Sequence, residues 1–261
     1  MDLGISDKVA VVTGASKGIG AATVLGLAAE GAKVACCARG EDALKQLRKD
    51  AAGLPGSVQT WRSDLTAGDE LDRFFEEVRA SLGEVDILVN NLGASPSRNF
   101  LYMKEDDWES GLNVNLMVSV RSTQLVLPAM RKKKWGRVIM VSSGAAKYPS
   151  APLIDYAAAK AALLAVTKSL ARKYGSDQVL VNAVLPGLIR TDMWERTAAE
   201  IAESTGASVD GVFDERGARV PLGRFGTAQE VADVIVYLAS ARAGYVNGAL
   251  VDVDGGLGDG I

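Results

Sequence analysis

The sequence contains no histidine among its 261 residues. Without an imidazole, the chain cannot carry a Ser-His-Asp hydrolase triad, a His-Glu-x-x-His metalloprotease site or an ordinary imidazole metal centre. Its two cysteines, Cys36 and Cys37, are adjacent on a predicted strand. Because neighbouring strand residues point to opposite faces, this pair favours core packing over a disulfide framework or a metal site. We therefore predict no metal.

Long apolar runs are missing as well, and the charge is nearly balanced. No apolar segment approaches 18 residues, and no basic start followed by a hydrophobic region precedes Lys8. We therefore expect a cytoplasmic protein that makes no membrane contact. The net charge of −3 gives no sign of a nucleic-acid partner. Since 48% of the residues are hydrophobic, the chain can bury a full core.

Apolar runs typical of strands alternate with helical segments along the whole chain. This alternation predicts an α/β protein whose βαβ units form a parallel sheet with helices on both faces. No linker, repeat or low-complexity tract divides residues 1–261, so we expect a single domain. The predicted strands lie near residues 8–13, 33–38, 57–62, 85–90, 136–142, 178–185 and 249–253.

A glycine-rich turn follows the first predicted strand and leads into an Ala/Leu-rich helix. Gly14 permits the tight turn, Gly18 lets the backbone approach a pyrophosphate, and Gly20 lets the helix pack closely on the strand. The free N–H groups at the start of the helix would face the phosphates. A tight structural turn would also explain the glycines, but the order strand, glycines, helix favours a dinucleotide site. Its candidate contacts are Gly14, Ser16, Lys17, Gly18, Ile19 and Gly20.

The end of the second predicted strand indicates which dinucleotide is bound. An acidic residue there would bind the adenosine ribose of NAD and repel a 2′-phosphate, but this position is Ala38. Arg39 follows and can grip a 2′-phosphate through a bidentate, charge-assisted contact, and Lys17 can add charge from the opposite side. We therefore predict NADP rather than NAD. Exposed basic residues without a ligand are the alternative reading of Lys17 and Arg39.

A serine, a tyrosine and a lysine together predict carbonyl chemistry. Tyr156 and Lys160 are four residues apart, so on a helix their side chains share one face. The ammonium would lower the pKa of the phenol, and Ser143 would hydrogen-bond the substrate oxygen. Together they would act as a general acid when a carbonyl is reduced and as a general base when an alcohol is oxidised. Taken alone, the Tyr-x-x-x-Lys spacing also occurs on exposed helix faces.

These motifs together resemble the short-chain dehydrogenase/reductase family, and within it ketoreductases of the 3-oxoacyl-carrier-protein reductase type. Residues 13–20 match the family's Thr-Gly-x-x-x-Gly-x-Gly motif, and residues 90–93 match Asn-Asn-x-Gly with Leu92 in place of the usual alanine. The resemblance runs from about residue 6 to residue 256. Further matching positions are Asn115, Ser143, Tyr156, Lys160, Pro186, Gly187 and Thr191.

The resemblance implies further features of the fold and the site. It implies a Rossmann-like, doubly wound sheet with seven strands in the order 3-2-1-4-5-6-7, in a homotetramer or homodimer. Asn115 would kink a helix over residues 105–130 and hold a water linking Lys160 to solvent; a core asparagine bonded to backbone is the alternative. Asp64 and Leu65 would contact adenine, although Asp64 could equally cap the next helix. The implied catalytic residues are Asn115, Ser143, Tyr156 and Lys160, and the further cofactor contacts are Asp64, Leu65, Asn91, Gly93, Tyr156, Lys160, Pro186, Gly187, Ile189 and Thr191.

We expect residues of about 190–220 to form a lid over the substrate. The segment has three glycines among charged residues and is longer than in compact ketoreductases, so we predict that it is mobile and orders on binding. Its apolar residues could instead belong to the core or to an interface. The predicted pocket is mostly apolar, which favours a hydrophobic or aromatic ketone over a small polyol. Its candidate walls are Leu92, Ser95, Tyr148, Leu153, Ile154, Leu188, Met193, Trp194 and Phe213.

The sequence thus predicts an NADP-dependent oxidoreductase that transfers a hydride between nicotinamide and a carbonyl or secondary alcohol. The expected reaction is reduction of a hydrophobic or aromatic ketone or of a 3-oxoacyl-type substrate. An NAD-dependent secondary-alcohol dehydrogenase of the same fold is the nearest alternative. A non-catalytic, dinucleotide-sensing binding protein is another alternative, and the intact Ser143, Tyr156 and Lys160 argue against it.

Overall fold

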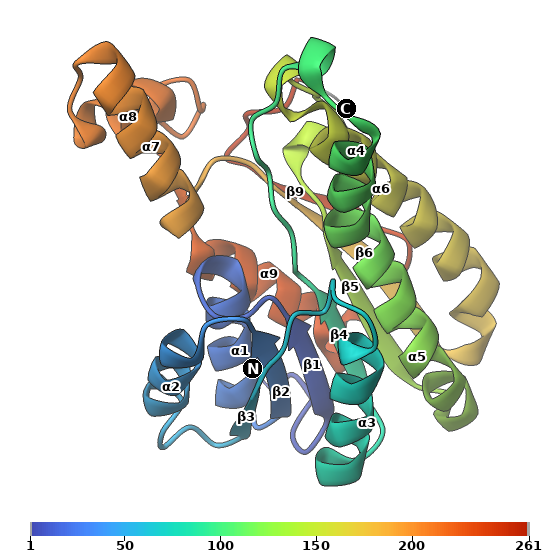
Figure 1. Cartoon of the computed structure of the whole chain (residues 1–261). Helices are drawn as coiled ribbons and strands as arrows, with labels where there is room; N and C mark the ends of the chain where they lie inside the picture. Colours follow the sequence, from blue (N-terminus) through green and yellow to red (C-terminus); the bar gives the residue numbers. More distant parts are fainter. Residues whose placement is uncertain (1, 260–261) are drawn as a thin grey trace.

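The computed structural model describes residues 2–259 and contains a seven-stranded parallel sheet. Its order is β3-β2-β1-β4-β5-β6-β9, so the predicted order is confirmed, with the C-terminal strand in seventh place. Helices cover both faces of the sheet (Figure 1). The strands are β1 (Val9–Thr13), β2 (Lys33–Ala38), β3 (Ser57–Arg62), β4 (Ile87–Asn90), β5 (Gly136–Val141), β6 (Val179–Pro186) and β9 (Leu250–Val253).

The central strands are buried on both sides because their runs are apolar without alternation. In β1, Val9 and Val11 belong to the core on one face of the sheet, whereas Ala10 belongs to the core on the other face. Such continuous burial is typical of parallel strands between two helical layers. Cys36 and Cys37 divide between the two faces in the same way, and both are buried. The predicted packing role of the two thiols is therefore confirmed.

Two helical layers enclose the sheet. Leucines and valines of α1, α2 and α9 fill the core on one face, and those of α3, α5 and α6 fill the core on the other. No helix within residues 2–259 is both long and apolar enough to span a membrane. The helices are α1 (Gly18–Ala29), α2 (Glu41–Asp50), α3 (Glu70–Leu82), α4 (Glu105–Leu112), α5 (Val118–Lys133), α6 (Ile154–Tyr174) and α9 (Ala228–Ala239).

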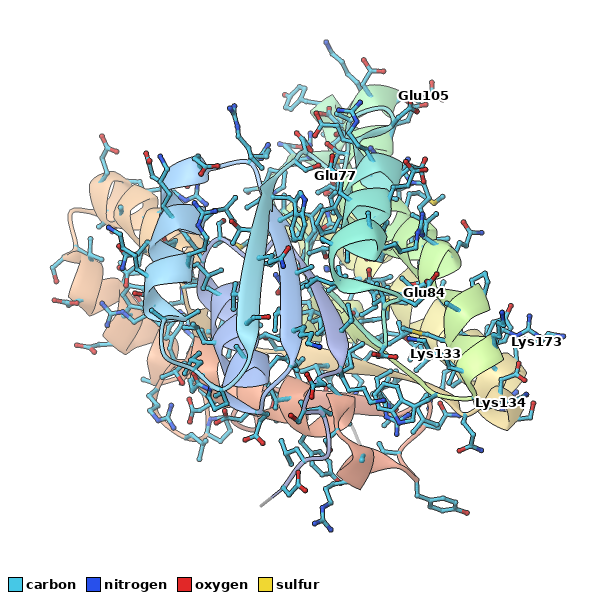
Figure 2. The ribbon with its side chains drawn as sticks, turned by 90° about the horizontal axis from the view of Figure 1, so that it is seen from below. Glu77, Glu84, Glu105, Lys133, Lys134 and Lys173 are labelled. Atoms are coloured by element: carbon cyan, nitrogen blue, oxygen red, sulfur yellow. The ribbon has the colours of Figure 1, made fainter. Side chains whose placement is uncertain are left out.

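Charged side chains lie at the two ends of the helical segment formed by α4 and α5. Figure 2 shows Glu105, in the first turn of α4, far from Lys133 and Lys134 at the end of α5. Acids near a helix start and bases near a helix end both complement the helix dipole. Lys133 also pairs with Asp86, with Nζ 2.8 Å from Oδ1.

The helix expected over residues 105–130 is interrupted by a π-helical turn. α4 ends at Leu112, the turn η2 (Asn113–Met117) follows, and α5 begins at Val118. Asn115 lies in the middle of this turn and is 1% exposed. A π-turn accommodates one additional residue and therefore bends a helix. The π-helical turn therefore lies where the resemblance implies a kink at Asn115.

The predicted lid folds as two helices that stand away from the sheet in Figure 1. α7 (Asp192–Thr205) and α8 (Val209–Gly217) enclose a small apolar cluster of their own. A two-residue parallel ladder between β7 (Ile189–Arg190) and β8 (Gly226–Thr227) closes its base. This ladder was not predicted, because two residues are too short for a periodic pattern. The mobility of the lid stays a prediction.

Candidate active site

The loops that follow five strands meet at one edge of the sheet. Because every strand of the main sheet is parallel, the carboxyl ends lie together there. The glycine loop follows β1, Arg39 follows β2, Asn91 follows β4, Ser143 follows β5 and Gly187 follows β6. The fold thus gathers at one edge candidate residues that are far apart in the sequence.

The glycine loop has a backbone that fits a pyrophosphate. Gly14 and Gly18 have positive φ angles of 64° and 56°, which glycine adopts without strain. α1 begins at Gly18, and Lys17 at its N-cap makes no side-chain capping bond. No capping side chain therefore occupies the first-turn N–H groups, and the positive end of the helix dipole lies at the same place. These are the groups that would hold the phosphates of a dinucleotide.

Asn91 hydrogen-bonds the backbone at the start of the glycine loop. Its Nδ2 donates to the carbonyl oxygens of Thr13 at 3.0 Å and of Gly14 at 2.9 Å. Its backbone N–H donates to Thr13 Oγ1 at 3.0 Å. A Cβ on Gly20 would lie 2.5 Å from this Nδ2, so the amide fills the space that the glycine leaves. The direct contact between Asn91 and a cofactor stays a prediction.

The two basic residues expected at a 2′-phosphate have different surroundings. Arg39 is exposed, and its charge helps to hold the pKa of Asp64 below the ordinary value, although the hydrogen bond from Thr66 contributes most. Lys17 forms an ion pair with Asp192, the first residue of α7, with Nζ 2.5 Å from Oδ2. Lys17 is therefore linked to the lid in this structure, whereas Arg39 is open to solvent at the end of β2.

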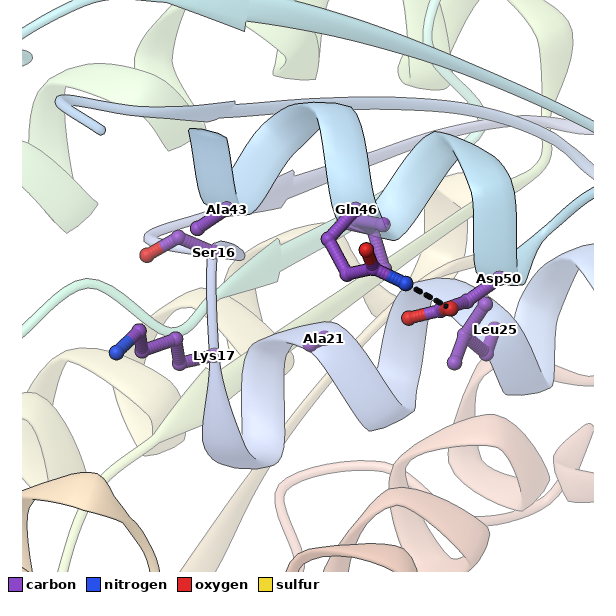
Figure 3. Close-up of a pocket in the computed structure, with 8 residues that line it drawn as sticks. Ser16, Lys17, Ala21, Leu25, Ala43, Gln46 and Asp50 are labelled. Atoms are coloured by element: carbon purple, nitrogen blue, oxygen red, sulfur yellow. Dashed lines mark hydrogen bonds between the residues drawn. The ribbon is translucent and has the colours of Figure 1, made fainter. Parts of the chain in front are cut away.

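A shallow crevice between α1 and α2 starts beside the glycine loop (Figure 3). Gln46 Nε2 donates to Asp50 Oδ1 at 2.7 Å along its α2 wall. Ser16 and Lys17 line the end of the crevice next to the glycine loop (Figure 3).

Asp64 does not cap the helix that follows it. Its Oδ1 accepts from the backbone N–H of Thr66 at 3.1 Å and from the Thr66 hydroxyl at 2.6 Å. Asp69 occupies the N-cap of α3 instead. Leu65 is 3% exposed and belongs to the main core. The adenine contacts of Asp64 and Leu65 stay predictions.

Ser143, Tyr156 and Lys160 come together at the carboxyl end of β5. Ser143 hydrogen-bonds Tyr156 through their side chains and caps the short turn after the strand. Lys160 Nζ lies 5.6 Å from the centre of the Tyr156 ring and donates to the carbonyl oxygen of Val141 at 2.8 Å. A serine hydroxyl and a phenol that share a hydrogen bond can both reach one substrate oxygen.

Burial controls the ionisation of the tyrosine and the lysine. It raises the pKa of the Tyr156 phenol above 10.0, against an opposing effect of the hydrogen bond with Ser143. It lowers the pKa of Lys160 to about 8. In the chain alone desolvation dominates at Tyr156, and the Lys160 amine bonds the Val141 carbonyl. The lowering of the phenol pKa by Lys160 together with a bound, cationic cofactor ring stays a prediction.

Asn115 and Gly93 lie next to Lys160. A Cβ on Gly93 would lie 2.9 Å from Asn115 Oδ1 and 3.3 Å from Lys160 Nζ. The amide of Asn115 donates to the carbonyl oxygens of Ala94 at 2.8 Å and Gly111 at 3.1 Å, and its Oδ1 accepts from the Ala94 N–H at 3.0 Å. Asn115 thus has the backbone bonds of a core asparagine and is also close to the lysine. The water-mediated relay stays a prediction.

The segment after β6 returns to the glycine loop. Pro186 ends β6, Ile189 begins β7, and Thr191 is the N-cap of α7. A Cβ on Gly18 would lie 3.2 Å from Thr191 Cγ2. Gly187 packs on the chain after β9, where the Cβ of a larger residue would have no room. This segment therefore lies where the resemblance requires a second side of the cofactor site.

The predicted pocket walls that lie at this edge come from three segments. Ser95, in the loop after β4, donates to the sulfur of Met193 in α7 at 3.0 Å. Leu92 lies in the same loop as Ser95, and Leu153 and Ile154 lie at the start of α6, all three half-buried. Contact between the loop and the lid therefore closes one side of the site.

Three predicted wall residues, Leu188, Trp194 and Phe213, pack in the core of the lid instead. The rings of Trp194 and Phe213 pack edge-to-face on Phe225, with ring centres 5.1 and 4.9 Å apart. Phe213 is 5% exposed, and the Arg190 guanidinium lies 4.2 Å from its ring centre. The prediction that Phe213 lines the pocket is wrong, because Phe213 is buried in the separate apolar core that α7 and α8 enclose.

The sequence analysis did not identify Arg98 and Asp155. Asp155 directly precedes Tyr156, is 1% exposed, and has its Oδ2 3.2 Å from Arg98 Nε. An acid in the first turn of a helix is common because it complements the dipole. Nothing in the local pattern therefore marked Asp155 as a buried charge.

Comparisons with known proteins agree with this geometry. The family model described as short chain dehydrogenase matches residues 8–202. A 3-oxoacyl-[acyl-carrier-protein] reductase of Thermotoga maritima is 40% identical over 253 residues, which are 97% of this chain and 98% of that protein. The L-sorbose reductase of Gluconobacter frateurii, solved with NADPH and L-sorbose, has a TM-score of 0.96 and 34% identity, with 100% of each chain covered. An actinorhodin polyketide ketoreductase solved with NADPH has a TM-score of 0.90 and 32% identity, with 97% of this chain and 98% of that chain covered.

Proposed function

The chain belongs to the short-chain dehydrogenase family, and from that premise we propose that it reduces a hydrophobic or aromatic ketone, or a 3-oxoacyl-type substrate, with NADPH. It is an oxidoreductase that interconverts a CH–OH group and a carbonyl, with NADP as its cofactor. The observation that carries the proposal is the shared position of Ser143, Tyr156 and Lys160 beside the glycine loop.

The residues of the site supply the proton in this reaction. NADPH, when bound, supplies the hydride that adds to the carbonyl carbon. Tyr156 donates its phenol proton to the carbonyl oxygen, and the Ser143 hydroxyl holds that oxygen by a hydrogen bond. Since burial raises the pKa of Tyr156, the phenol is protonated at neutral pH. A protonated phenol is the form that can donate a proton to the carbonyl oxygen during reduction.

The choice of NADPH rests on the end of β2. Ala38 provides no carboxylate that would repel a 2′-phosphate, and Arg39 is exposed beside it. Titration of the protein with NADPH and NADH, followed by protein fluorescence, tests this choice. We expect NADPH to bind at least tenfold tighter, by about 1.4 kcal/mol, and Arg39→Asp to remove the preference. Equal binding of NADH would favour the NAD-dependent alcohol dehydrogenase.

The substrate class is supported by the apolar residues that remain at the site. Leu92, Leu153 and Ile154 are half-buried there and favour an apolar ligand over a polyol. A panel containing an aromatic ketone, a 3-oxoacyl thioester and L-sorbose tests this proposal. Higher kcat/KM for the first two supports it, and higher kcat/KM for L-sorbose contradicts it. Tight NADPH binding without turnover on a broad carbonyl panel would favour the dinucleotide-sensing protein.

We also propose that the enzyme is a cytoplasmic homotetramer or homodimer. Ala158, Ala161 and Ala165 are exposed on α6, so a second helix could approach closely there, whereas Ala157 is buried. Size-exclusion chromatography with light-scattering detection measures the oligomeric state. A monomer at micromolar concentration would contradict the proposal.

A further inference from the structure

A buried ion pair joins the first turn of α6 to the loop after β4. Arg98, in that loop, has its Nε 3.2 Å from Oδ2 of Asp155. Asp155 is 1% exposed, whereas the Arg98 side chain is 21% exposed. A carboxylate removed from water remains charged only beside a compensating charge. Arg98 supplies that charge through the ion-pair contact, although neither carboxylate oxygen of Asp155 accepts a hydrogen bond from within residues 2–259.

Arg98 holds a second carboxylate and a backbone carbonyl as well. Its guanidinium donates to Asp107 in the first turn of α4, where Asp107 also accepts from the Lys104 N–H at 2.9 Å. The backbone N–H of Arg98 donates to the Pro152 carbonyl at 2.8 Å, in the turn that leads into α6. A guanidinium can hold two carboxylates at once, which a single ammonium cannot do as well. Arg98 therefore ties the loop, α4 and α6 together.

On its other side Asp155 packs against the backbone of α4 at Gly111. A Cβ on Gly111 would lie 2.5 Å from Asp155 Oδ2, so the carboxylate rests on the helix backbone. Asn115 donates to the carbonyl of this same glycine at 3.1 Å. Asp155 thus lies between the guanidinium and the helix that carries Asn115, and the next residue in the chain is Tyr156.

We propose that Arg98 and Asp155 are positioning residues that set the place of Tyr156 relative to the bound ketone. The proposal rests on the proposed function and requires neither residue to touch the substrate. The loop that Arg98 holds also carries Leu92 and Ser95 of the pocket wall. The ion pair therefore sets the distance between the wall that places the ketone and the phenol that protonates it. A misplacement of about 1 Å can lower a rate about 100-fold.

The test compares ketone reduction by Arg98→Gln, Arg98→Lys, Asp155→Asn and the double variant Arg98→Gln/Asp155→Asn. We expect Arg98→Gln to lower kcat by about 10- to 100-fold. The dissociation constant of NADPH should change less than about twofold, because the glycine loop lies outside the network. Arg98→Lys should lose less activity, since an ammonium can still hold one carboxylate. The double variant should recover part of the loss in kcat, because no buried charge is left without a partner.

A matched control removes another arginine–carboxylate pair. Arg131 Nε lies 2.7 Å from Asp177 Oδ2 at the end of α5, and the Arg131 side chain is 51% exposed. Arg131→Gln should leave kcat unchanged. Circular dichroism and the unfolding temperature of each variant separate loss of folding from loss of turnover. Should Arg98→Gln not fold, Arg98→Lys and the double variant carry the test.

The outcomes separate this inference from the proposed function. A wild-type protein that reduces no carbonyl compound overturns both. Turnover by the wild type together with unchanged kcat in Arg98→Gln overturns the inference alone. Equal losses of kcat, NADPH affinity and unfolding temperature, without recovery in the double variant, also overturn it, because they assign the pair a purely structural role. A loss confined to kcat and reduced in the double variant supports it.

Discussion

Lys160→Met should stabilise the fold at neutral pH while it removes turnover. The Lys160 amine is buried, and its pKa falls from 10.5 in an exposed lysine to about 8. That shift corresponds to about 3 kcal/mol of unfavourable burial of the charged form. Methionine has a similar shape and no charge to desolvate. Loss of the 2.8 Å hydrogen bond to the Val141 carbonyl costs about 1 kcal/mol, so about 2 kcal/mol of net stabilisation remain at pH 7.

The pH dependence of this stabilisation follows from the direction of the shift. Below pH 8 the lysine is charged in both the folded and the unfolded state. The folded wild type then bears the full free-energy cost of burying the charged amine. Between pH 8 and 10.5 the unfolded state keeps a proton that the folded state has lost, so the wild type gains stability as the pH rises. Above pH 10.5 the amine is neutral in both states, so this cost of burial no longer lowers the stability of the wild type. The advantage of Lys160→Met should therefore shrink to less than about 1 kcal/mol at pH 9.5.

Urea unfolding at one protein concentration, at pH 7 and pH 9.5, measures this difference. In a separate thermal unfolding experiment at pH 7, we expect the unfolding temperature of Lys160→Met to lie about 5 °C above that of the wild type. Lys168→Met, at an exposed position of the same helix, is the control and should change the free energy of unfolding by less than about 0.5 kcal/mol. A Lys160→Met protein that is less stable than wild type at pH 7, or equally favoured at both pH values, would refute the reasoning.

Three further predictions follow from buried groups. Gly20→Ala should destabilise the fold by about 1–3 kcal/mol, because its Cβ would lie 2.7 Å from a backbone oxygen of the glycine loop. The same change should abolish the quenching of protein fluorescence by NADPH. Gly40→Ala, with no atom within 4 Å, should not destabilise it in the same unfolding assay, and equal effects would contradict the contact. Cys36 and Cys37 should react with a thiol reagent only on unfolding, since burial raises the pKa of both and that of Cys36 to about 12; rapid labelling of the native protein would be inconsistent with this. Asn115→Leu should lower kcat more than NADPH affinity in steady-state and binding assays, whereas equal losses would assign Asn115 a structural role alone.

The sheet could be predicted because its strands are encoded locally. Residues 9–13 are mostly β-branched and are buried on both faces, and such a continuous run is typical of a parallel strand between two helical layers. The glycine loop was equally predictable. Its backbone needs positive φ angles at Gly14 and Gly18, and glycine is the residue that adopts them without strain. The helical spacing of Tyr156 and Lys160 likewise places both side chains on one face.

The lid was predicted less well, for a physical reason. Its apolar residues carry a helical pattern, but that pattern does not say which surface they cover. Phe213 and Trp194 pack on Phe225 within the lid and not over the substrate site. The choice between these two surfaces depends on where the helices stand relative to the sheet.

The sequence by itself determined the fold, the glycine loop and the set of candidate catalytic residues, because periodicity, backbone freedom and residue chemistry are local properties. Only the tertiary structure decided the partners of the charged groups. Lys17 meets Asp192 from 175 positions away, and Asp155 is buried against Arg98. It also decided the direction of the pKa shift at Tyr156, since desolvation depends on the packing of many segments around one atom.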